Sequence, residues 1–293
     1  MNSHQLSVLL PTSSPAVVFA EVKKVFLFHY DPDQFTPVER HYSSVEALFD
    51  GRFPGYRRCN TEYHNFSHTV DTFLAVMRLA DGFNLVEGPL PALTVARLLS
   101  AALFHDTGYI QKAWDTLGTG AKYTREHVMR GKEFTAENAA ALGLAEEDLT
   151  EISRYIDSTG HTAVLKSDSG APLEERMATS LLGAADLIAQ MSDRVYLEKL
   201  LFLYYEFREA GIQGYDTEYD IIRKTVDFYH LTMDRLEKDF NGVHHYVTRH
   251  FQERFGVAKD LYQEAIERNV AYVRTILDDH HSNFRTKLKR VSH

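Results

Sequence analysis

The sequence is poor in the residues that cross-link a chain or break its helices. Cys59 is the single cysteine, so no disulfide can form within the chain, which suits a reducing compartment. Only 8 prolines and 16 glycines occur in 293 residues, and this scarcity favours long helices over a turn-rich all-β fold. No apolar run approaches the roughly 20 residues of a membrane span, and the N-terminal residues lack the basic and long apolar regions of a signal peptide. We therefore expect a cytoplasmic protein with no membrane partner.

Positive charge is also scarce. Lys and Arg number 32 against 41 Asp and Glu, which gives a formal net charge of −9. Nucleic acids and anionic membranes attract clustered Lys and Arg, so an acidic chain is a poor general ligand for either. A local basic pocket for one phosphate group is still compatible with this charge, so a small phosphorylated partner stays open.

Apolar residues recur mostly at helical spacing. Ser14 followed by Pro15 is typical of a helix start, and a second, short helix is expected to begin at Ser44. Further helices are predicted from about residue 65 and over residues 92–106, 126–142, 146–158, 174–191, 194–210, 217–240, 244–255 and 258–281. No strand pairs, repeats or low-complexity linkers are evident, so we predict an all-α fold. We expect N-terminal helices over 1–59, a core over 60–191 and a C-terminal helical extension over 192–293, as one compact unit.

Histidines and acids interrupt three of the apolar helices. In YHNFSHTVD (63–71), His64 and His68 are four residues apart and so share one helix face. The pair is compatible with core filling, a metal clamp or part of an active site. His105 and Asp106 end the apolar run LLSAALFHD, and Asp186 lies within TSLLGAADLIAQM. A buried carboxylate is costly unless it is paired or bound to a cation, and imidazoles with carboxylates suit Zn, Fe, Mn, Co or Ni.

The order of these residues resembles a known pattern. H…HD…D resembles the HD-domain metal-dependent phosphohydrolase superfamily, and YHNFSH with Asp71 is similar to the Tyr-His-Asn-x-x-His-x-x-Asp stretch of cyclic-nucleotide phosphodiesterases. Residues 183–206 are similar to bacterial HD phosphohydrolases. The resemblance implies a phosphodiesterase-like helical bundle with its HD metal-binding core at 60–191. The purine clamp and the HPG-type continuation of the phosphodiesterases are not recognisable, so phosphoester hydrolysis is better supported than cyclic-nucleotide specificity.

The resemblance also implies a role for each residue. The implied metal ligands are His68, His105, Asp106 and Asp186. His64 would act as general acid, so His64 and Asp106 are the candidate catalytic residues. Asn65 and Asp71 would orient the ligands. One divalent metal (Mn, Fe, Zn, Ni, Co or Mg) would activate water against a small phosphoester such as a nucleotide.

Several assignments stay open at this point. His127 and His161 match the histidines that bind a second metal in some HD proteins, although a helix-flanking and a loop histidine explain them as well. Glu133 is either a contact to metal-bound water or a solvated acid of a first helical turn. The alternatives to a hydrolase are a catalytically silent nucleotide-sensing module and a two-metal HD oxygenase, and the oxygenase would need both of these histidines.

Other unusual stretches carry weaker signals. The members of the pairs His244-His245 and His280-His281 are adjacent in sequence and so diverge by about 100° on a helix, and we expect no metal site at either pair. The aromatic run LFLYYEF (201–207) is interpreted as core, as a homodimer face or as the wall of a substrate pocket. Tyr109 and Trp114, which follow the HD dipeptide, are candidates for the mouth of that pocket.

Overall fold

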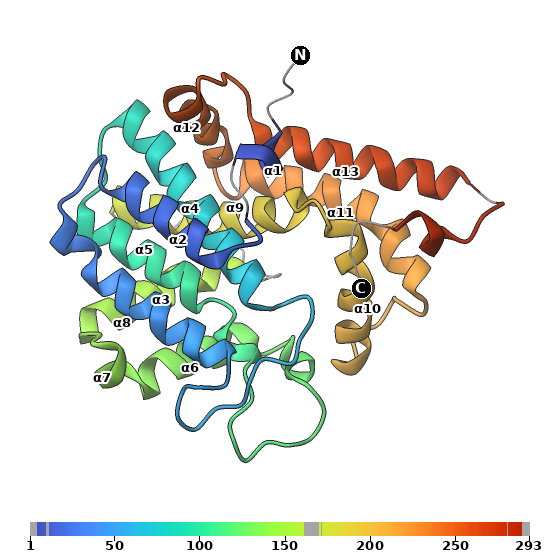
Figure 1. The fold of residues 1–293 in the computed structure, drawn as a ribbon, viewed down its shortest axis with the longest axis horizontal. Coiled ribbons are helices and arrows are strands. Elements are labelled where there is room, and N and C mark those ends of the chain that lie inside the picture. Colours follow the sequence, from blue (N-terminus) through green and yellow to red (C-terminus); the bar gives the residue numbers. More distant parts are fainter. Residues whose placement is uncertain (1–4, 10–11, 161–169, 171, 280, 289–293) are drawn as a thin grey trace.

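The computed structural model describes residues 5–9, 12–160, 170, 172–279 and 281–288. These residues form a bundle of α-helices without a β-strand, so the all-α prediction is confirmed (Figure 1). The α-helices are α1 Leu6–Leu9, α2 Pro15–Phe26, α3 Thr36–Phe49, α4 Phe66–Glu87, α5 Ala92–Phe104, α6 His127–Glu137, α7 Ala139–Leu142, α8 Glu146–Ile156, α9 Leu173–Ser192, α10 Tyr196–Glu209, α11 Glu218–Lys238, α12 Tyr246–Phe255 and α13 Leu261–Asp278. None of the described helices has the length and apolar character needed to cross a membrane.

Two helices differ from their predicted bounds. Helix α3 begins at Thr36 and not near Ser44, because Pro37 lies in its first turn, where a missing N–H leaves no bond unmade. The helix predicted over residues 126–142 is two helices, α6 and α7, which meet at Asn138. The Asn138 amide donates to the Phe134 carbonyl at 2.8 Å, a side-chain bond that competes with regular helix geometry.

Helix α4 is the centre of the bundle. It packs against α2, α5, α9 and α12, and its side chains are buried on nearly every face from His68 to Asn84. Its contact with α12 is unusually close at Gly82, where a Cβ atom would lie 1.9 Å from the Tyr246 carbonyl oxygen. Only glycine fits such an approach. The buried part of α4 begins at His68, so this side chain already lies in the interior in the first turn of the helix.

The C-terminal helices lie beside this centre. Helix α13 packs on α9 and α11, while α10 and α11 pack on each other and lie to one side of the bundle that α2 to α5 form (Figure 1). The N-terminal helices α2 and α3 pack on α4 and α5, respectively. The three-part division at residues 59 and 191 stays a prediction, since these contacts do not separate the parts.

Candidate metal centre

The predicted metal ligands converge from three helices. His68 comes from the first turn of α4, His105 and Asp106 from the end of α5, and Asp186 from the middle of α9. Asp106 Oδ2 lies 3.4 Å from His68 Nε2 and 3.3 Å from His105 Nε2. Asp186 Oδ1 lies 3.1 Å and 3.6 Å from the same two nitrogens. We call these four residues the His-Asp cluster.

Two atoms of the His-Asp cluster are buried without a hydrogen bond. They are His105 Nε2 and Asp106 Oδ2, and both belong to residues almost fully enclosed by protein. The other ring nitrogen of His105, Nδ1, lies 2.8 Å from the Ala102 carbonyl oxygen. A carbonyl oxygen only accepts, so this contact places a proton on Nδ1, and in the neutral ring Nε2 is then the nitrogen with a lone pair for another partner. Buried polar atoms rarely remain unpaired, and His68, His105 and Asp106 form a buried group whose ligand atoms are close enough together to hold a metal ion.

The charges in the His-Asp cluster are strongly coupled. Burial lowers the pKa of His105, but the adjacent Asp106 carboxylate outweighs burial and raises it to about 9. Burial would raise the pKa of Asp106, yet the nearby His105 holds it well below its usual range. The carboxylates are therefore ionised. A metal would displace the His105 proton, because a ligating imidazole must be neutral on the bound nitrogen.

His127 lies next to the His-Asp cluster at the start of α6. Its Nε2 is 3.9 Å from Asp106 Oδ1, whereas the contacts of His68 and His105 with Asp106 are to Oδ2. Its Nδ1 lies 2.7 Å from the Thr124 carbonyl oxygen, so again Nε2 keeps its lone pair, and burial lowers its pKa. Helix α6 can come this close because residue 108 is a glycine. A Cβ atom at this position would lie 1.9 Å from the His127 carbonyl oxygen.

A family model described as Npun_R2479-like matches residues 113–248, somewhat less than half of the chain. The match includes His127 and Asp186 but begins after His68, His105 and Asp106. No curated protein matches the sequence.

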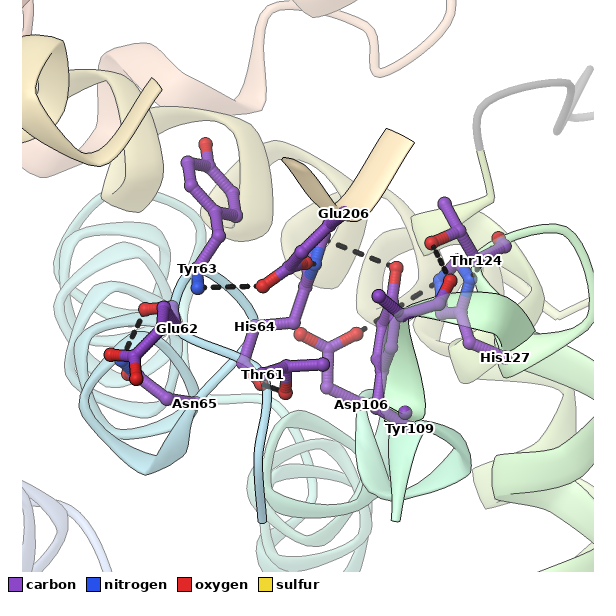
Figure 2. Close-up of polar contacts among 12 residues, drawn as sticks. Thr61, Glu62, Tyr63, His64, Asn65, Asp106, Tyr109, Thr124, His127 and Glu206 are labelled. Atoms are coloured by element: carbon purple, nitrogen blue, oxygen red, sulfur yellow. Dashed lines mark hydrogen bonds and ion pairs between the residues drawn. The ribbon is translucent and has the colours of Figure 1, made fainter. Parts of the chain in front are cut away.

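His64 does not face the His-Asp cluster as a fifth ligand. Its Nδ1 lies 2.6 Å from Glu206 Oε2, and its ring stacks on Tyr109 with centroids 4.2 Å apart (Figure 2). The other oxygen of Glu206 accepts the Tyr63 backbone N–H at 2.8 Å, which fixes the turn that carries His64. Burial lowers the pKa of His64, but Glu206, Asp106 and Asp186 together raise it above its usual value.

Glu206 and its contact with His64 were missed from sequence. Glu206 lies on α10, far from the motif in sequence, within the run LFLYYEF. A carboxylate in an apolar run was the signal that identified Asp106 and Asp186, and the same signal is present here. Tyr109, expected near the pocket mouth, is fully buried against His64, whereas Trp114 is 78% exposed.

The remaining candidate site residues lie in different parts of the structure. Asn65 caps α4, and its side-chain oxygen accepts the His68 backbone N–H at 3.2 Å, so Asn65 does support a proposed ligand. Asp71 lies in a different cavity, with Arg78 and Asp193, that contains none of the proposed ligands. Glu133 is exposed and lines a small cavity beside Gly108. His161 lies outside the described residues.

The second histidine pair has a carboxylate beside it. Glu237 Oε1 lies 2.9 Å from His245 Nε2 and 3.5 Å from His244 Nε2, so one carboxylate accompanies this pair, and the absence of a metal site there stays a prediction. The reason is the fold: the end of α11 turns back through residues 239–245 and brings Glu237 beside the two rings. His280 of the other pair lies outside the described residues.

Proposed function

We propose that the protein is a metal-dependent phosphohydrolase of the HD type, and that it cleaves a small phosphoester at the His-Asp cluster. The observation that carries the proposal is the pair of buried, unpaired atoms on His105 and Asp106, between two further donors on His68 and Asp186. His68, His105, Asp106 and Asp186 would hold the metal. When bound, the metal would polarise a phosphoryl oxygen and lower the pKa of water.

The chain's own residues account for the proton that the reaction needs. Hydrolysis forms a bond from a water oxygen to phosphorus and breaks the phosphorus–ester oxygen bond, so the leaving oxygen takes up a proton. His64 can donate this proton from Nε2, because Glu206 holds Nδ1 and raises the pKa of the ring. Nε2 lies 3.4 Å from the Tyr109 hydroxyl on the side of the ring away from Glu206. His64 therefore acts as general acid, and Glu206 positions it.

A second cation beside Asp106 is the one variation that a specific observation favours. Asp106 presents Oδ2 to His68 and His105, and Oδ1 to His127 at 3.9 Å. A carboxylate with both oxygens directed at imidazoles can bridge two metals. Two bound metals would make a dinuclear hydrolase, or an HD oxygenase, more suitable than the one-metal mechanism.

A substrate screen tests the proposal. Wild-type protein supplied with Mn, Ni, Zn or Fe would be assayed on nucleoside mono-, di- and triphosphates, cyclic nucleotides, and simple alkyl and aryl phosphates. We expect turnover of at least one class and its loss in Asp106→Ala, while Glu237→Ala, a carboxylate beside the distant histidine pair, stays active. Equal activity in wild type and Asp106→Ala would exclude this site. No turnover with any metal would favour the silent sensing module.

A further inference from the structure

A cavity of about 140 Å³ lies next to His64, on the side of the molecule formed by α9, α10 and α11. Most of its wall is apolar or aromatic, and the residues that matter here are Leu200, Leu203, Phe207, Ile221 and Phe228. Leu203 and Phe207 belong to the aromatic run of α10, so one interpretation of that run, the wall of a pocket, has structural support. A cavity of roughly 150 Å³ with apolar walls accepts a benzene-sized ring.

Three of the polar groups in the wall have partners within the protein. Gln190 Oε1 accepts the Tyr63 hydroxyl at 2.8 Å, and the Thr225 hydroxyl donates to the Ile221 carbonyl at 2.8 Å. The Lys224 ammonium donates to the Gly214 carbonyl. A nucleobase presents several donors and acceptors along its edges, and burying them without partners is costly. An uncharged apolar ring has no such requirement.

His64 connects this cavity to the His-Asp cluster. Its ring lines the cavity and also stacks on Tyr109, which in turn stacks on His127 with centroids 4.8 Å apart. If His64 protonates the leaving oxygen, the group attached to that oxygen lies on the His64 side of the phosphorus. The cavity is bordered by the same His64 ring, so we assign it to the leaving alcohol and not to the phosphoryl group.

We propose that this cavity binds a single uncharged, largely apolar ring, and that the substrate is therefore a phosphoester of an aryl or arylalkyl alcohol and not a nucleotide. That the ring belongs to the substrate rests on the proposed function, whereas the binding of the ring itself does not. The ring enters between α10 and α11, its hydroxyl oxygen points to His64, and the apolar wall excludes water from it.

The direct test is binding of the product alcohol, which requires no turnover. The probe is 4-fluorobenzyl alcohol, followed by ¹⁹F NMR on the full chain, with and without added Zn. We expect saturable binding that adenosine and cytidine do not displace. Leu203→Trp, which fills the cavity, should weaken binding at least tenfold. Leu201→Trp is the matched control, because Leu201 is also half-buried on α10 but does not line the cavity.

A second variant keeps the test decisive if Leu203→Trp fails to fold. Phe228→Ala enlarges the cavity and should shift the preference from 4-fluorobenzyl alcohol to 6-fluoro-2-naphthol. The proposal is overturned if the probe does not bind, if neither variant changes binding, or if adenosine displaces the probe. Probe binding without hydrolysis of any ester would leave the cavity assignment standing and remove the proposed function. Nucleotide hydrolysis without probe binding would support the proposed function and remove the cavity assignment.

Discussion

Two buried carboxylates in this bundle have opposite surroundings. Asp81, on α4, accepts hydrogen bonds from His29 at 2.6 Å, from His250 at 2.6 Å and from Arg254 at 2.6 and 3.1 Å. Asp106 is equally enclosed, yet its Oδ2 has no hydrogen bond. The protein itself neutralises Asp81, and the hydrogen bonds of Asp81 join α4 to the turn after α2 and to α12. Asp106 is paired with the imidazoles of His68 and His105, which would themselves bind the proposed cation, and this difference distinguishes a structural cluster from a candidate metal site.

The pKa of Asp81 agrees with this interpretation. Burial alone would raise it, but the hydrogen bonds from His250, His29 and Arg254 outweigh burial and hold the pKa below its usual value. The ionised form is thus the stable one in the folded protein. No further partner is needed, and we expect no metal at Asp81.

The largest expected effect is the loss of stability when Asp81 is removed. Asp81→Ala leaves the buried His250 and the partly buried His29 and Arg254 without their acceptor, and breaking a buried ion pair in this way costs about 3–5 kcal/mol. In the metal-free protein, Asp106→Asn should cost less than Asp81→Ala, because it keeps the size of the side chain and Oδ2 has only ion-pair contacts with His68 and His105 to lose. Urea unfolding of both variants measures this. Equal losses would remove the distinction between the two carboxylates.

Added metal should sharpen the same distinction. At a free metal concentration of one hundred times Kd, binding stabilises the folded state by about 2.7 kcal/mol. Wild type and the conservative variant Asp81→Asn should both gain this amount with Zn or Mn in thermal melts. His105→Ala, which lacks the unpaired nitrogen, should gain little. An undiminished gain in His105→Ala would place the metal elsewhere.

Glu206 is an intermediate case, a buried carboxylate whose main partner is a single histidine. Because the carboxylate raises the pKa of His64, the protonated ring persists to higher pH than an ordinary histidine. The rate should therefore fall as pH rises through this raised pKa. Glu206→Gln should move that fall to lower pH, and an NMR titration of His64 should show the same shift without turnover. An unchanged His64 titration in Glu206→Gln would contradict the positioning role.

The smallest expected effect is at the cap of α4. Asn65→Ala removes the acceptor for the His68 backbone N–H and should cost about 1 kcal/mol in urea unfolding. Asn65→Asp keeps an acceptor at this position and serves as the control. Metal affinity should weaken with Asn65→Ala, because the first turn that holds His68 frays. Affinity equal to wild type, despite the lost stability, would show that the cap does not position His68.

Most helices could be predicted because their periodicity is a local property. Helix α9 was expected over 174–191 and occupies Leu173–Ser192, with Asp186 in its buried stretch. The start of α3 was wrong because Pro37 was not recognised as a first-turn residue. Residues whose neighbours come from distant segments were harder. The sequence does not indicate that Glu206 meets His64 across 142 positions, or that Asp71 turns toward Arg78 and Asp193.

The His-Asp cluster could be predicted since each of its acids interrupts an apolar helix. Asp81 interrupts an apolar helix as well, and its cationic partners come from α12 and from the turn after α2. Sequence alone gives both carboxylates the same signal. Only the packing shows which of them the protein itself neutralises.

The most direct test of the central claim is the metal content of the purified chain. Protein stripped with a chelator and reconstituted separately with Zn, Mn, Ni, Fe or Co would be desalted and measured by elemental analysis beside Asp106→Ala, His105→Ala and Asp81→Asn. We predict at least one tightly held metal per chain in wild type and Asp81→Asn, and its loss in Asp106→Ala and His105→Ala. A wild-type chain that retains none of these metals, or an Asp106→Ala chain that retains as much as wild type, would contradict it.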